Sequence, residues 1–128
     1  MPVMRIKDYA KTHIQRGHSM YVKYTSTKSR FRHDVEMTLD WVLKDIENHE
    51  AVLAIKENYH RYHVVEANIP IGDDLHRGKR VVCFHVMVVS VKTIKNYNAV
   101  ITAYPINEGK CVFFYVCVYG CLVTNGVY

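Results

Sequence analysis

The sequence predicts an α+β fold in which two N-terminal helices pack on a mostly antiparallel sheet of four to five strands. Two observations predict it. Before residue 50, apolar side chains recur at three- and four-residue spacing, which is the period of amphipathic helices. From residue 51 onward they form short alternating runs separated by Gly, Pro, Asn and Asp, which is the pattern of strands joined by short turns.

Length and composition indicate one folded domain over residues 1–128. A chain of 128 residues can bury a core without disulfide bonds, and no repeat, low-complexity segment or linker divides it. The four cysteines lie in apolar runs without the paired spacing of a zinc site, so we expect buried thiols, no metal and no cofactor. Lys and Arg outnumber Asp and Glu by 17 to 12. This excess of positive charge indicates an anionic partner, with nucleic acid as the first candidate, or serves solubility alone.

No segment has the features of a membrane anchor or a leader. Charged residues and histidines interrupt every apolar run before it reaches the ~18 residues of a membrane-spanning helix. The charged residues Arg5, Lys7, Asp8 and Lys11 leave no apolar leader core. We therefore expect no membrane contact and a cytoplasmic protein, either in its own cell or delivered into a target cell.

The first predicted helix covers residues 5–17, with Gly17 as its stop. Its inward stripe consists of Ile6, Tyr9, Ala10, His13 and Ile14. A histidine on that stripe points toward the sheet, where a buried imidazole needs a polar partner. His13 is therefore either a core histidine bonded to a carbonyl or a catalytic residue.

Residues 19–32 form a basic loop rich in Lys, Arg, Ser, Thr and Tyr. Its cations are candidates for contact with nucleic-acid phosphates: Lys23, Lys28, Arg30 and Arg32. The second predicted helix covers residues 34–48, with acidic residues in its first turn. Its apolar stripe consists of Val35, Leu39, Val42, Leu43 and Ile46.

Strands fill the rest of the chain. Residues 51–56 and 62–69 predict a hairpin, residues 70–79 a polar connector, and residues 80–93 one long strand. Residues 99–106 and 111–119 predict two further strands, each after a short turn. Alternation in the long strand places four side chains on one face: Cys83, His85, Met87 and Val89.

Histidines are the most unusual feature, because they titrate near neutral pH and two of them can take and give a proton in one reaction. The candidates are His13, His18 just after the first helix, and His85, provided that the helices cover its face of the sheet. The alternative is that these are structural histidines with satisfied hydrogen bonds. No phosphate-binding glycine loop, HExxH or GxSxG motif is present.

The first hairpin carries a basic and aromatic cluster: Lys56, Tyr59, His60, Arg61 and His63. Cations bind phosphate and planar rings stack on bases, so this cluster is a candidate for RNA binding, although an exposed, solvated hairpin has the same composition. Thr102 and Tyr104 share one face of the strand 99–106, where either hydroxyl could bond a phosphate oxygen or simply line the sheet.

Taken in order, the helix with THIQRGH, the hairpin with AIKENYHRYHVV, a long strand and the strand VITAYPI resemble the superfamily of small toxin ribonucleases that includes barnase, EndoU, colicin tRNases and RelE. The match spans about residues 6 to 106 and rests on arrangement more than on sequence. The strand 111–119 is an addition to that pattern, and could cover a sheet edge or build a homodimer.

The resemblance implies cleavage of RNA, with tRNA as one candidate substrate, without a metal. The ribose 2′-hydroxyl would attack the adjacent phosphorus and leave a 2′,3′-cyclic phosphate. The site residues that it implies are the helix histidine His13, the hairpin cations Lys56 and Arg61, and the strand residues Thr102 and Tyr104. His18, His63 and His85 are further candidates for acid or base. A toxin of this kind also implies a cognate antitoxin or immunity protein with an acidic surface.

Two other functions fit the same residues. A non-catalytic nucleic-acid-binding module would use the basic loop and the hairpin, and would bind RNA or DNA in a salt-dependent way without cleaving it. An interaction protein, such as an immunity or inhibitor subunit, would pair its last strand with a partner and would not need His13. We favour the endoribonuclease.

Overall fold

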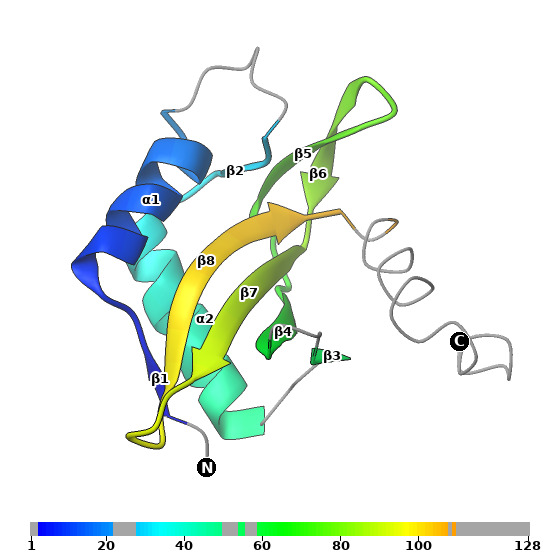
Figure 1. The fold of residues 1–128 in the computed structure, drawn as a ribbon. Coiled ribbons are helices and arrows are strands. Elements are labelled where there is room, and N and C mark those ends of the chain that lie inside the picture. The colour runs from blue at the N-terminus through cyan, green and yellow to red at the C-terminus, as the bar shows by residue number, and fades with distance from the viewer. Residues whose placement is uncertain (1–2, 22–27, 50–53, 56–58, 108, 110–128) are drawn as a thin grey trace, which may run out of the picture.

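The computed structural model describes residues 3–21, 28–49, 54–55, 59–107 and 109 of the chain. Its elements are β1 (Met4–Arg5), α1 (Asp8–His18), β2 (Arg30–Phe31), α2 (Val35–His49), β3 (Ala54–Ile55), β4 (His60–Glu66), β5 (Gly72–His76), β6 (Lys79–Cys83), β7 (His85–Lys92) and β8 (Asn98–Ile106) (Figure 1). The predicted α+β class is confirmed, since these residues form two helices and two sheets. The prediction of one sheet is wrong. The predicted strand 111–119 lies outside the described residues.

The larger sheet has five strands in the order β1–β8–β7–β4–β3. The antiparallel pairings β3–β4, β4–β7 and β7–β8 confirm the predicted hairpin and the mostly antiparallel sheet. β1 is the exception, since it runs parallel to β8 and pairs with Asn98 and Ala99 alone. Beyond Ala99, helix α1 packs along the outer edge of β8 (Figure 1).

Helix α2 covers one face of this sheet. Its predicted apolar stripe is confirmed, because Val35, Leu39, Val42, Leu43 and Ile46 are all buried. These side chains share one cluster with the sheet residues Val65, Val88 and Ala103. Asp34 caps the helix, because its carboxylate accepts a hydrogen bond from the Met37 N–H at 3.2 Å. In the described part of the chain, neither helix is long and apolar enough to cross a membrane.

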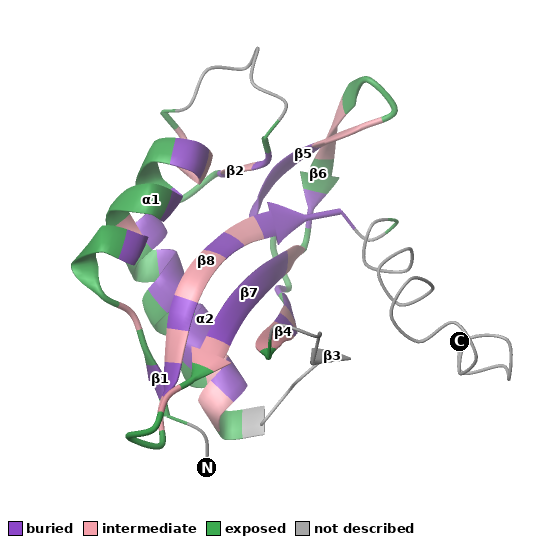
Figure 2. Ribbon diagram, in the orientation of Figure 1, coloured by how far each residue is buried: buried purple, intermediate pink, exposed green. Residues whose placement is uncertain are grey.

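Helix α1 buries a narrower stripe than predicted. Its buried residues are Ala10, Ile14 and Gly17, whereas Tyr9 is 71% exposed and His13 is exposed as well. The reason is that α1 lies along the edge of the larger sheet rather than across its face. Only one line of its residues therefore packs against the rest of the protein (Figure 2). The helix also continues through Gly17 to His18, one residue beyond the predicted stop.

Residues 70–79 contain strands rather than the predicted polar connector. β5 and β6 form a hairpin whose two-residue turn places Arg77 and Gly78 at φ values of 52° and 77°. β2 pairs with β5 and completes a second, three-stranded sheet. β5 could not be recognised from its sequence because its buried residue Asp73 is polar. The guanidinium of Arg32 neutralises the Asp73 carboxylate at a distance of 2.8 Å, but Arg32 lies 41 positions away in the chain.

The predicted long strand over residues 80–93 is broken at Phe84, whose carbonyl accepts a hydrogen bond from the Ala67 N–H at 2.7 Å. The segments on either side belong to different sheets. Cys83 is a buried thiol, as predicted, but it packs in the cluster under α2. Met87 lies in a cluster on the other face, so the prediction that both share a face is wrong. The other three cysteines lie outside the described residues.

The face of the larger sheet that is turned away from α2 carries this smaller cluster, in which Met87, Val89 and Ile106 are buried. Thr102 lies opposite Val89, and Tyr104 lies opposite Met87. The prediction that Thr102 and Tyr104 share a face is therefore confirmed.

β8 contains a β-bulge opposite Val89 and Ser90 of β7. One extra residue, Ile101, lies between Val100, which is paired with Ser90, and Thr102. Val100 packs in the cluster under α2, and Ile101 packs against the cluster on the other face.

Candidate functional site

An open pocket of about 490 Å³ lies between the C-terminal half of α1, the end of β8 and strand β5. We call it the histidine pocket, and its lining residues are His13, His18, Lys28, Ser29, Asp74, Thr102, Tyr104 and Ile106. Four predicted catalytic residues and one predicted RNA-binding cation therefore meet in one place, although they come from distant segments of the chain.

His18 is held at the end of α1 by two contacts. Its Nδ1 atom lies 2.7 Å from the carbonyl oxygen of Ser29, and its ring stacks on Tyr104 with 5.5 Å between ring centroids. A carbonyl oxygen can only accept a hydrogen bond, so Nδ1 carries the proton in this contact. In the neutral ring, Nε2 is then the nitrogen that can accept a proton.

The surroundings of His18 favour its neutral form. Burial lowers the pKa of its imidazole, and the positive charges of Lys28 and His13 lower it further, while the Ser29 carbonyl and the Asp74 carboxylate act in the opposite direction. The net pKa lies below the ordinary value of 6.5. An imidazole that is neutral at pH 7 and bonded through Nδ1 has the properties of a general base.

His13 lines the pocket without being buried, so the prediction of an inward, buried His13 is wrong. The helix places it beside Gly17, and the charge of His13 is close enough to influence the pKa of His18. The two histidines therefore differ in exposure, which suits two different roles in one proton-transfer reaction.

Lys28 and Asp74 place opposite charges in the same pocket. Lys28 Nζ approaches helix α1 at Gly17, which has no side chain. The distance from Nζ to the position that a Cβ on Gly17 would take is 3.5 Å. Asp74 is 3% exposed, and its two carboxylate oxygens accept hydrogen bonds from the backbone N–H groups of Leu75, at 2.8 Å, and of Asn107, at 3.4 Å. Asp74 thus joins β5 to the end of β8, and no pattern in the sequence predicted it there.

Other predicted residues lie elsewhere. His63 is 1% exposed, and its Nε2 atom lies 2.9 Å from Ser90 Oγ, so it is a structural histidine in the interior. Arg61 donates to Asn98 Oδ1 at 3.4 Å, at the start of β8, whereas the pocket is at its end. Tyr59 and His60 lie at that same distant end, next to Arg61. They therefore do not join the histidine pocket.

The remaining cations and His85 also lie outside the pocket. Arg32 and Arg30 both contact the Asp73 carboxylate, at 2.8 and 3.8 Å, and so hold β2 against β5. His85 pairs with Ile106 on the face that also carries Thr102 and Tyr104, but it does not line the pocket with His13. Lys23 and Lys56 lie outside the described residues.

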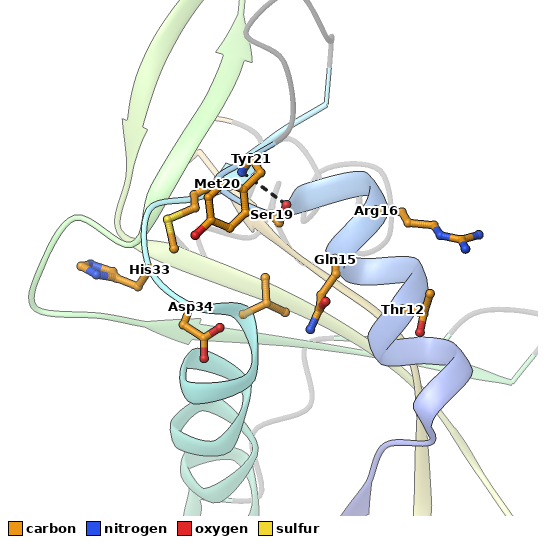
Figure 3. A pocket seen from close by; sticks show the side chains of 9 residues that line it. Thr12, Gln15, Arg16, Ser19, Met20, Tyr21, His33 and Asp34 are labelled. Atoms are coloured by element: carbon orange, nitrogen blue, oxygen red, sulfur yellow. Dashed lines mark hydrogen bonds between the residues drawn. The ribbon is translucent and has the colours of Figure 1, made fainter.

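A second cavity, of about 370 Å³, lies on another side of α1, toward the start of α2 (Figure 3). Its polar groups serve local structure, because Asp34 caps α2 and Ser19 Oγ accepts a hydrogen bond from the Tyr21 N–H at 3.3 Å. Figure 3 shows the side chains of Arg16 and His33 pointing away from its centre. The histidine pocket is therefore the better candidate for chemistry.

Comparison of the chain with protein-family models, with curated proteins and with solved structures finds no match. Among the described residues, no three His, Cys, Asp or Glu side chains are placed to hold a metal ion together. The histidine pocket is therefore the feature of the described residues that points to a function.

Proposed function

We propose that the chain is an endoribonuclease that cleaves RNA by attack of a ribose 2′-hydroxyl on the adjacent phosphorus, without a metal. The observation that carries this proposal is the meeting of two histidines of different exposure with a lysine and with the strand residues Thr102 and Tyr104 in one open pocket. These are the groups that the reaction needs: a base, an acid, and donors for a phosphorane.

In this reaction His18 Nε2 takes the proton of the 2′-hydroxyl. The oxygen forms a bond to phosphorus, and the bond from phosphorus to the 5′-oxygen breaks. His13, in its protonated form, donates a proton to the departing 5′-oxygen, and the products are a 2′,3′-cyclic phosphate and a 5′-hydroxyl. Because His13 is exposed, it regains its proton from solvent, and His18 returns its own.

The developing negative charge on the phosphorane is stabilised by groups already in place. Lys28 supplies a positive charge, and the hydroxyls of Thr102 and Tyr104 supply hydrogen bonds to the non-bridging oxygens. Asp74 brings a negative charge into the pocket, but backbone N–H groups engage both of its oxygens and reduce its repulsion of phosphate.

A non-catalytic RNA-binding module is the second candidate, because Lys28 and the stacked pair of His18 and Tyr104 would also suit a bound nucleotide. The lowered pKa of His18 favours catalysis instead. A module that only binds RNA gains from a protonated histidine, whereas a general base must be neutral. If the chain is a toxin, its cytoplasmic partner is an antitoxin or immunity protein that offers acidic residues to Lys28.

The test uses the full chain with total RNA and with tRNA in EDTA, followed by detection of cyclic phosphate ends. We expect cleavage by the wild type and by His33→Ala, whose histidine is exposed outside the pocket, but not by His13→Ala or His18→Ala. Circular dichroism checks that each variant is folded. If RNA binds but stays intact at micromolar protein, the proposal of an enzyme is rejected and the chain is a binding module.

A further inference from the structure

We propose that the β5–β6 hairpin is an arm that binds the RNA backbone beside the histidine pocket, so that the enzyme prefers extended single-stranded RNA to a dinucleotide. This inference rests on the proposed function and names its class of substrate. The arm consists of His76, Arg77, Gly78, Lys79 and Arg80, a stretch without an acidic residue.

The arm begins at the pocket. Asp74 lines the pocket, and Arg77 follows it by three residues along β5 and the turn. At a rise of about 3.3 Å per residue, the tip lies about 10 Å from the pocket wall, which suits contact with a neighbouring phosphate rather than with the scissile one. Figure 1 shows the hairpin projecting from the end of the molecule at which β8 and α1 both finish.

A hydrogen bond fixes the arm to the segment that lines the pocket. Arg80 Nη1 donates to the Lys28 carbonyl oxygen at 2.9 Å, and Lys28 and Ser29 are both pocket residues. A cation at the tip of the arm is therefore positioned relative to the proposed catalytic groups.

Arginine at the tip is not a residue that the turn itself requires. Arg77 has φ 52° and Gly78 has φ 77°, and two-residue turns with these angles favour Asn, Asp or Gly at the first position. A long side chain held at positive φ carries a backbone cost. The exposed guanidinium and the exposed Lys79 beyond it match what an RNA phosphate needs.

The turn between β7 and β8 provides a matched control. It follows Lys92 and also carries Lys95, and both lysines are exposed. This turn lies at the start of β8, whereas Thr102 and Tyr104 lie toward the end of that strand. Removal of its two cations changes the net charge as much as removal of the two arm cations, but far from the pocket.

The experiment compares Arg77→Gly/Lys79→Ala with Lys92→Ala/Lys95→Ala in the full chain. Glycine accepts positive φ, so the arm keeps its turn. Binding is measured against salt for a single strand of about 12 nucleotides with 2′-O-methyl ribose, which cannot be cleaved, and its length lies in the range that single-strand grooves cover. Cleavage is measured for a dinucleotide and for the corresponding unmodified strand.

We expect the arm variant to cleave the dinucleotide at the wild-type rate and to lose about tenfold on the long strand. The slope of log binding constant against log salt should fall by about 1.4 in magnitude, at about 0.7 for each lost phosphate contact with a single strand. The control variant should show much smaller changes. An unchanged slope in the arm variant, or an equal loss in the control, overturns the proposal.

The two proposals fail in different ways. If the wild type cleaves neither substrate, the proposed function is lost, while binding of the 2′-O-methyl strand still decides whether the arm contacts RNA. If the arm variant binds that strand normally but loses affinity for polyglutamate, the arm is a docking site for an acidic protein, and the RNA proposal is overturned.

Discussion

The Nδ1 atom of His18 lies 2.7 Å from the carbonyl oxygen of Ser29, and the Ser29 hydroxyl lies 3.4 Å from the same nitrogen. The shorter contact is to the backbone, and therefore survives substitution of the serine side chain. The tautomer that leaves Nε2 as the proton acceptor is thus fixed by the backbone at Ser29 rather than by a side chain.

Substitution of Ser29 and of His18 should accordingly have very different effects. Ser29→Ala keeps the carbonyl and should lower kcat/KM by less than about threefold, whereas His18→Ala should lower it by at least about 100-fold, as expected for loss of a general base. Steady-state cleavage of a short RNA measures both. A large loss in Ser29→Ala would mean that the hydroxyl, and not the carbonyl, positions the ring.

The pH dependence of cleavage should report the environment of His18. Because its pKa is lowered, the acidic limb of kcat/KM should fall off only below the ordinary value of 6.5. Lys28→Met removes a positive charge that lowers this pKa, so the limb should move to higher pH. Asp74→Asn removes a negative charge that raises it, so the limb should move to lower pH. Shifts in the reverse directions, measured over a full pH–rate profile, would show that His18 is not the base.

Tyr104 combines a stacking ring with a hydroxyl, and two substitutions separate them. Tyr104→Phe keeps the ring against His18 and should lower kcat by roughly 10- to 100-fold through loss of one hydrogen bond to a charged group. Tyr104→Ala should lower it further, because His18 loses its stacking partner. Tyr97→Phe, whose ring lies under Arg5 near β1, is the matched control. Full activity in Tyr104→Phe would limit this residue to a packing role.

Gly72 lies where β5 passes close to Pro105, near the end of β8. A Cβ there would lie 2.5 Å from Pro105 Cγ and 2.6 Å from the Arg30 carbonyl oxygen. Gly72→Ala should therefore lower the free energy of unfolding by about 1–3 kcal/mol through overpacking. Gly17→Ala, whose nearest new contact would be 3.5 Å away, should leave stability unchanged or raise it, since alanine favours a helix. Urea unfolding followed by circular dichroism measures both, and equal stabilities would contradict the close approach.

The period of apolar residues predicted those parts of the fold in which a single helix or strand determines which side chains share a face. The stripe of α2 was correct because a helix that lies across a sheet buries a broad face, from Val35 to Ile46. The shared face of Thr102 and Tyr104 followed from strand alternation alone. Both predictions needed only the period of one element.

Predictions failed where a distant segment determines the outcome. His13 is exposed because α1 lies along the edge of the sheet, and the helical period does not encode that position. Strand β5 resembled a loop because the partners of Asp73 are distant in the chain: Arg30 on β2 and Arg32 just after it. Asp74 was missed for the same reason, since no local signal marks a carboxylate that is buried by a neighbouring strand.

The bulge at Ile101 reverses the phase of alternation within a single strand. If β8 kept Ile101 but were regular, Val100, Thr102 and Tyr104 would all point to the same side, and burial of Val100 beneath α2 would turn both hydroxyls away from the histidines. Deletion of Ile101 itself would leave Val100 and Thr102 as neighbours on opposite sides, with the pocket residues on their present face. The orientation of the pocket hydroxyls relative to the core therefore depends on the parity of a residue count, and the bulge supplies the parity that this sequence needs.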